Sequence, residues 1–213
     1  MSGSGNGPQS PLWIRFGAWG DASRREIGLP VHADGLTLRR IGLQDLEAVW
    51  EYRSDPEVAR YQFQGPATRE ELGAQIEYQL KAEAGTQGVP VLLAVESEGR
   101  VIGECGLTVT NREDRQGALG YQFHPRFTGR GFATRAVAIT LGLGFQQLGL
   151  HRIVAESDVR NERSCRLLER VGLRREAHFR HDHFIKGEWV DSYLYAILDE
   201  EWPMRHLEAS KAQ

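Results

Sequence analysis

A strand-to-helix turn near the middle of the chain constrains the fold more than any other feature of the sequence. The run ALGYQFH (118–124) has a strand-like pattern, PRFTGRG (125–131) is polar with two glycines, and a long, mostly apolar run begins at Phe132. Glycine permits a positive φ and lets another group approach the main chain closely. The sequence therefore predicts a strand, a tight turn and a helix in direct succession.

Apolar spacing and turn residues predict further elements on both sides of this unit. We expect strands at 36–41, 89–96, 100–110, 118–124, 151–159, 174–185 and 188–198. We expect helices from 43 to a stop at Asp55-Pro56, and at 68–85, 132–149 and 161–172. Thr68 with Glu71 forms a capping box, and Asn161 is a natural N-cap. The order βααβββαβαββ predicts one α/β or α+β domain whose sheet carries helices on both faces.

The ends of the chain differ in composition from this domain. Residues 1–11 are rich in Gly, Ser and Pro, which predicts disorder, and residues 12–35 carry Trp13 and Trp19 without a clear period. We therefore expect an N-terminal extension over 1–35, a domain over 36–204 and a C-terminal tail over 205–213. The tryptophans are compatible with packing on the domain or with a homodimer contact.

Charge and cysteine content exclude several classes of protein. A net charge of −3 and a pI near 6.2 disfavour a nucleic-acid-binding surface. No stretch approaches the roughly 20 apolar residues of a membrane span, and the N-terminus lacks signal-peptide features. Cys105 and Cys165 are too few for a disulfide framework and are expected to be small buried side chains. We expect a cytoplasmic protein.

The glycine turn is also a candidate anion site. Backbone N–H groups at a helix N-terminus lie at the positive end of its dipole and attract phosphate oxygens, and Arg126 and Arg130 add positive charge. A nucleotide-hydrolase phosphate loop is excluded because no lysine follows Gly131. A dinucleotide fingerprint remains an alternative, with Thr134 where its third glycine is expected.

A third template, Arg/Gln-x-x-Gly-x-Gly/Ala, is met by Arg126, Gly129 and Gly131. With LTLRRIGLQDLEAVW, IGECGL, NERSCRLLERVGL and KGEWVDSYLYAILDEEW in order, the chain resembles the GNAT superfamily of acetyl-CoA-dependent N-acetyltransferases from about residue 36 to 202. It most resembles the RimJ/RimL-like branch, the ribosomal-protein N-terminal acetyltransferases. The resemblance implies one GNAT-type domain with a mixed, mostly antiparallel sheet. It also implies transfer of an acetyl group from acetyl-CoA to a primary amine by direct attack on the thioester.

The resemblance also assigns cofactor contacts. The coenzyme A pyrophosphate would lie on the turn, whose residues are Arg126, Phe127, Thr128, Gly129, Arg130, Gly131 and Phe132. The pantetheine arm would pair with the strand end at Gln122, Phe123 and His124, near an oxyanion donor at the N–H of Phe123. Asn161 matches the asparagine that contacts this arm, and Ser164 follows three residues on. The alternative is that Asn161 has only a structural role, as the N-cap of its helix.

The sequence identifies the catalytic acid and base less specifically than it identifies the cofactor contacts. Many GNAT relatives carry a tyrosine at the position of Leu168, and the ribosomal branch is expected to use Ser164 as the acid instead. For the base, His183 occupies the position of that branch's glutamate, with Glu104 an equal rival and Glu156 a third candidate. A solvated histidine, and an ordinary serine in the first turn of a helix, are the structural alternatives.

The histidines of the last hairpin are candidate metal ligands. Strand alternation would place His181 and His183 on one face, with Asp182 on the other and His178 nearby. Two histidines at i and i+2 need a third ligand from another element, and the sequence marks none. We expect no metal.

The sequence does not specify the amine that accepts the acetyl group. Residues 57–71, with Glu57, Arg60, Tyr61 and Phe63, are expected to form part of the acceptor wall, which suits either a small-molecule amine or a protein N-terminus. Two other functions stay open: an acyl-CoA-binding regulatory module without turnover, supported by Leu168, and a dinucleotide-binding enzyme. No nucleic-acid or membrane partner is expected.

Overall fold

The computed structural model describes residues 27–63 and 65–202. The predicted C-terminal tail and most of the predicted N-terminal extension, including Trp13 and Trp19, lie outside these ranges. No helix in the described ranges is long and apolar enough to cross a membrane.

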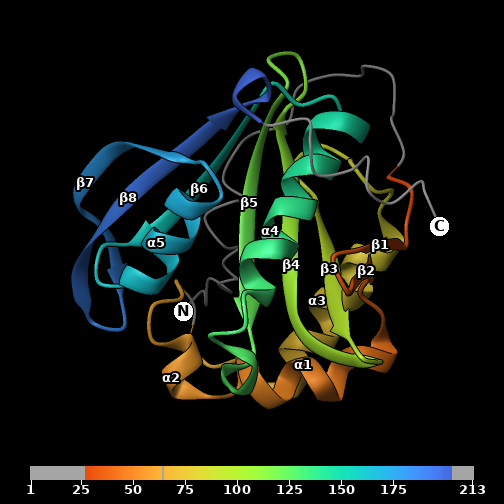
Figure 1. The fold of residues 1–213 in the computed structure, drawn as a ribbon. Helices are drawn as coiled ribbons and strands as arrows, with labels where there is room; N and C mark the ends of the chain where they lie inside the picture. Colours follow the sequence, from red (N-terminus) through yellow and green to blue (C-terminus); the bar gives the residue numbers. More distant parts are fainter. Residues whose placement is uncertain (1–26, 64, 203–213) are drawn as a thin grey trace, which may run out of the picture.

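One eight-stranded sheet organises the domain, in the order β1-β2-β3-β4-β5-β6-β8-β7 (Figure 1). The strands are β1 Val31–Ala33, β2 Leu36–Arg40, β3 Pro90–Ser97, β4 Arg100–Asn111, β5 Gln116–Phe123, β6 Arg152–Asp158, β7 Arg174–Ile185 and β8 Glu188–Leu198. All neighbours pair antiparallel except β5 and β6, which are parallel. The predicted mixed, mostly antiparallel sheet is confirmed.

Helices cover both faces of this sheet, as the sequence predicts. They are α1 Leu46–Arg53, α2 Pro56–Ala59, α3 Arg69–Lys81, α4 Phe132–Gly142 and α5 Glu162–Arg170, and a π-helical turn at Leu143–Gln147 continues α4. The larger core cluster joins α4 and α5 to one face, and a smaller cluster joins α1 and α3 to the other. In Figure 1, α4 lies in front of β4 and β5.

The parallel pair β5 and β6 separates along its length. Its recorded register extends only from Gln116–Arg152 to Ala118–Val154. Beyond Ala118, β5 continues to Phe123 beside β4 alone, while β6 continues beside β8. The two strands meet near the top of Figure 1 and diverge toward the bottom. This divergence opens the sheet next to the glycine turn.

Local capping signals are confirmed. The Thr68 side chain accepts a hydrogen bond from the N–H of Glu71, whose carboxylate accepts from Thr68. The Asn161 side chain accepts from the N–H of Ser164 at 3.1 Å and caps α5. Gly172 follows α5 with a φ of 101°, in the left-handed region that suits the end of a helix.

The boundaries differ from prediction at the N-terminal half. The domain begins before residue 36, because Ile27 is buried in the core and β1 pairs with β2 through a turn at Asp34 and Gly35. The first predicted helix stops where expected, because α1 ends at Arg53, just before Asp55-Pro56. It begins with a separate 3₁₀ turn at Leu43–Asp45, and Pro56 starts a further short helix, α2, which is capped by Asp55. Helix α3 ends at Lys81, before the predicted stop at Gly85.

The predicted alternation on the last hairpin is wrong. The register of β7 against β8 shifts between Phe179 and His183, and His181 has a φ of 49°. A bulge of this kind resets which side chains share a face. As a result, Asp182 and His183 lie together, with Asp182 Oδ2 3.3 Å from His183 Nε2, while His181 is exposed.

Candidate active site

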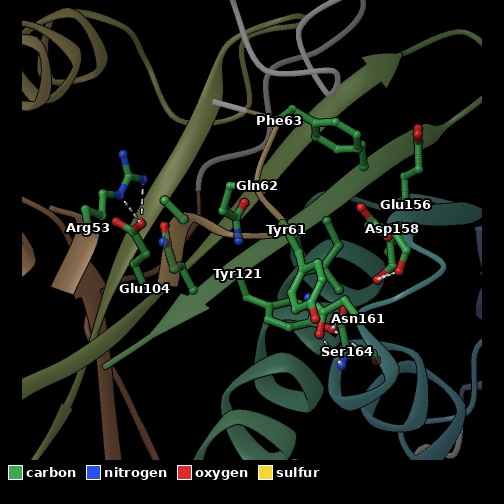
Figure 2. Close-up of a pocket in the computed structure, with 18 of the residues that line it drawn as sticks. Arg53, Tyr61, Gln62, Phe63, Glu104, Tyr121, Glu156, Asp158, Asn161 and Ser164 are labelled. Carbon is green, nitrogen blue, oxygen red and sulfur yellow. Dashed lines mark hydrogen bonds and ion pairs between the residues drawn. The ribbon is translucent and has the colours of Figure 1, made fainter. Parts of the chain in front are cut away.

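A cavity of about 220 Å³ lies at the divergence of β5 and β6. It extends from β4, across β5 and β6, to the first turn of α5, and the segment after α2 closes one side (Figure 2). Its polar lining includes Arg53, Tyr61, Gln62, Gln75, Glu104, Tyr121, Gln122, Glu156, Ser157, Asp158, Asn161 and Ser164. Of the predicted acceptor wall, Tyr61 and Phe63 line the cavity, whereas Glu57 and Arg60 do not.

The glycine turn leaves its main chain open. Gly129 and Gly131 have φ values of 80° and 75°, and a Cβ added at either position would meet no atom within 4 Å. Among the described residues, none accepts a hydrogen bond from the backbone N–H of Gly129, Arg130 or Gly131. Phe132 then begins α4, whose first N–H groups have no partner within the helix. These open donors fit a diphosphate.

The preceding part of the turn is internally bonded. The N–H groups of Phe127 and Thr128 donate to His124 and Pro125 carbonyls, and the N–H of Arg126 donates to Nδ1 of His124. The Arg126 guanidinium is exposed, 3.4 Å from Glu51. Residues 126–128 therefore shape the turn, and their N–H groups are not available to a ligand.

At the end of β5, beside the divergence, only alternate residues direct their backbone N–H and C=O groups away from β4. The N–H of His124 donates to the carbonyl of Ile102 on β4, at 3.0 Å. Hydrogen-bonded and non-hydrogen-bonded pairs alternate along an antiparallel ladder, so Gln122 also bonds toward β4. Tyr121 and Phe123 therefore direct their N–H and C=O groups toward the opening. Of the three residues expected to contact the pantetheine arm here, Phe123 has the suitable orientation.

The first turn of α5 brings three polar side chains together. The Oδ1 of Asn161 is used in capping, which leaves its Nδ2 group to donate to a ligand. Ser164 lies next to it, and its Oγ is 2.8 Å from the phenol of Tyr121. Sequence reasoning missed Tyr121, because only the fold brings β5 beside α5. Leu168 is fully buried and packs in the core.

Two of the candidate bases meet in space. His183 Nε2 lies 2.5 Å from Oε1 of Glu156, and both side chains are mostly buried. Glu156 lines the cavity, whereas His183 lies behind it against the ring of Phe63. Burial raises the pKa of Glu156, and the hydrogen bond with His183 opposes this rise.

Glu104, the rival candidate, is already paired. Its Oε1 accepts from Nε of Arg53 at 2.5 Å, and Arg53 also donates to Gln75 (Figure 2). Glu104 is 2% exposed, and its Oε2 is buried without a hydrogen-bond partner among the described residues. An unpaired carboxylate oxygen in a cavity wall is costly unless a ligand or water bonds to it.

The carboxylates and imidazole of Glu156, Asp182 and His183 also lie within 4.8 Å of one another. Their mutual hydrogen bonds, and a bond from Ser192 to Asp182, account for this arrangement. The histidine pair considered from the sequence does not form, since the bulge separates His181 from His183. His178 instead pairs with Asp191.

The cysteines behave as predicted. Cys105 and Cys165 are free thiols, and both are buried. Burial raises the pKa of Cys105 to about 12, which keeps it an inert thiol.

Comparison with known proteins identifies the family. Residues 35–174 match the family described as acetyltransferase (GNAT) domain. The chain belongs to this family. A Bacillus subtilis (strain 168) relative, named uncharacterized N-acetyltransferase YnaD, is 34% identical over 167 residues, which cover 78% of this chain and 95% of the relative. The GNAT chain is thus an acetyl-CoA-dependent N-acetyltransferase.

Solved structures agree with this assignment. A GNAT-family acetyltransferase from Bacillus anthracis superposes with a TM-score of 0.73 at 31% identity, covering 81% of this chain and all of that one. A spermidine N-acetyltransferase from Vibrio cholerae, described in complex with CoA and spermine, gives a TM-score of 0.71 at 25% identity, covering 79% and 98%. Both share the open, mostly antiparallel sheet of the GNAT fold.

Proposed function

We propose that this GNAT enzyme acetylates a small aliphatic amine that carries a second cationic group. The observation behind this proposal is the placement of two carboxylates in one cavity, Glu156 on β6 and Glu104 on β4. Asp158 is a third acidic residue in the lining, but Arg160 binds both of its oxygens, whereas Arg53 binds one oxygen of Glu104 and leaves Oε2 without a partner among the described residues. A cavity lined in this way attracts cations.

The separation of the two carboxylates suits a chain-like diamine. Because β5 lies between β4 and β6 and diverges from β6 beyond Val154, Glu104 and Glu156 are at least two strand spacings apart, about 10 Å or more. Figure 2 shows them at opposite sides of the cavity. The distal ammonium would pair with the Glu104 carboxylate, whose buried Oε2 has no hydrogen-bond partner among residues 27–63 and 65–202. The Vibrio cholerae relative with spermine is consistent with this substrate class.

Bound acetyl-CoA supplies the activated acyl thioester. The N–H groups of 129–131 would hold its pyrophosphate, and Asn161 the pantetheine arm. Glu156 then accepts the proton of the attacking amine, since its raised pKa makes it a stronger base than an ordinary carboxylate. The N–H of Phe123 faces the opening and donates to the carbonyl oxygen as negative charge develops there.

In this proposal Glu156 is the general base, rather than His183. His183 is separated from the cavity by Glu156 and acts by holding and orienting that carboxylate. Glu104 recognises the acceptor, because Arg53 already binds one of its oxygens. Ser164, on the turn of α5 that lines the cavity, donates a hydrogen bond to the departing sulfur.

A protein N-terminus is the second candidate acceptor, as the RimJ/RimL-like resemblance implies. The observation that favours it is the combination of Ser164 in the cavity with Leu168 in the core, where many other relatives carry tyrosine. We further propose a cytoplasmic location, which two unpaired cysteines and the use of acetyl-CoA favour.

A thiol-release assay over a panel of amines tests these alternatives. We expect diamines and polyamines to exceed a monoamine of equal length by about 10- to 100-fold in kcat/KM, because a hydrogen bond to a charged group contributes about 1.5–3 kcal/mol. A preference for peptides with a free N-terminus would support the second candidate instead. Cofactor binding with no turnover of any amine would contradict both and favour a regulatory module.

A further inference from the structure

We propose that Tyr121 is a positioning residue, whose phenol orients the Ser164 hydroxyl toward the sulfur that leaves during acetyl transfer. This inference rests on the proposed role of Ser164. It assigns a function to a residue that neither the sequence motifs nor the GNAT resemblance singled out.

The contact is direct and lies at the cavity. The Tyr121 hydroxyl is 2.8 Å from Oγ of Ser164 and 3.4 Å from its carbonyl oxygen. Both residues line the cavity, and Figure 2 shows their side chains converging beside Asn161. Leu168, where many relatives place a tyrosine, is fully buried in the core. The phenol at this site therefore comes from β5 rather than from α5.

The direction of this hydrogen bond follows from the surroundings. Burial raises the pKa of Tyr121, so the phenol keeps its single proton at neutral pH. Ser164 offers two acceptors to that proton, Oγ and the carbonyl, and Oγ is the nearer. Among the described residues, no other acceptor is recorded for the Ser164 hydroxyl. When Tyr121 donates to Oγ, the serine proton is left free to point into the cavity.

Accepting a bond also makes the serine a better donor. Hydrogen bonds in a chain polarise one another, and this strengthening is greatest where water is excluded. In the proposed reaction the C–N bond forms, the C–S bond breaks with its electron pair left on sulfur, and the amine proton goes to Glu156. Ser164 and Tyr121 keep their protons throughout and stabilise the thiolate by hydrogen bonding alone.

A double-mutant cycle tests the coupling. Tyr121→Phe should lower kcat about tenfold or more, in line with the loss of one hydrogen bond to a developing charge, with KM for acetyl-CoA within about twofold. Tyr121→Phe combined with Ser164→Ala should cost no more than Ser164→Ala alone, because the phenol acts through the serine. Tyr195→Phe is the matched control: it removes a buried phenol that bonds to Glu169 on α5, away from the cavity, and should leave kcat unchanged.

A binding measurement provides a readout independent of turnover. If Ser164 donates to sulfur, it favours the thiolate of bound CoA, so CoA affinity should rise by up to about tenfold as pH passes a thiol pKa near 8.5. Desulfo-CoA should show no such rise. Tyr121→Phe and Ser164→Ala should both lose it. Tyr121→3-fluorotyrosine keeps the shape of the side chain, makes the phenol more acidic, and should enlarge it.

The outcomes separate the two proposals. If Ser164→Ala retains full kcat and the CoA pH dependence, the proposed role of Ser164 fails. If Ser164→Ala is impaired but Tyr121→Phe behaves as wild type, only the positioning role fails. Losses that add in the double variant, or a 3-fluorotyrosine variant with an unchanged pH dependence, would also overturn it. The fluorinated variant decides the matter if Tyr121→Phe does not fold.

Discussion

The imidazole of His183 reaches across one strand to contact Glu156. Its Nε2 lies 2.5 Å from Oε1 of Glu156, although β8 separates β7 from β6 in the sheet. The bulge in β7 lies just before His183, whose imidazole contacts Glu156 behind the cavity wall. The pair thus depends on a local irregularity that brings a positioning group behind the proposed base.

Glu156→Gln should lower kcat/KM about 10²- to 10⁴-fold, because the amine loses its proton acceptor while the side chain keeps its shape. At neutral pH the same variant should also gain stability, with a free energy of unfolding equal to or above that of the wild type. The raised pKa of Glu156 means that its contribution to the free energy of unfolding is most favourable below the ordinary value and is lost as pH rises through the folded value. Thermal unfolding from pH 4 to 8 should show this gain shrinking toward acidic pH.

His183→Ala should shift the acidic limb of the kcat/KM profile to higher pH. The hydrogen bond from His183 lowers the pKa of Glu156, in opposition to burial, so its loss leaves burial less opposed. Activity should recover at alkaline pH, where the carboxylate is ionised again. His178→Ala, which removes an exposed imidazole paired with Asp191, is the matched control and should leave the profile in place. An unshifted limb in His183→Ala would contradict the positioning role.

Gly131→Val should abolish stabilisation of the protein by CoA. The side chain would stand where the diphosphate approaches the open N–H groups, and the left-handed φ of 75° adds strain of about 1–2 kcal/mol. Gly99→Val separates the two effects, because Gly99 has a φ of 72° and equally open surroundings in the β3–β4 turn. We expect both variants to melt lower without ligand. Only Gly99→Val should retain the wild-type rise in Tm with CoA, and a rise in both would show that the turn does not hold the diphosphate.

Glu104→Gln should remove the preference for a second charge in the acceptor. The amide can still accept from Arg53, but it no longer attracts a distal ammonium. We expect KM to rise about tenfold or more for diamines and to change little for a monoamine, since a hydrogen bond to a charged group contributes about 1.5–3 kcal/mol. The unpaired charge of Arg53 should also lower Tm. Equal losses for both amines would assign Glu104 to the catalytic step or to the fold.

Much of the fold could be predicted because its signals are local. The Thr68–Glu71 capping box, the glycines of the turn and the Asn161 cap each depend on residues within one turn of the chain. The short strand β1 was missed although Asp34–Gly35 is a typical two-residue hairpin signal. Three residues are too few for a period to show, so the turn was the available indication.

The sequence by itself determined the order of elements, the open glycine turn and the family resemblance, because these follow from neighbours along the chain. Only the tertiary structure decided which polar groups meet. Glu156 and His183 are 27 residues apart, Tyr121 and Ser164 are 43 apart, and Arg53 and Glu104 are 51 apart. Each contact depends on strand register, on the bulge in β7 or on the divergence of β5 and β6. Those features are set by packing across the whole sheet, which no local pattern encodes.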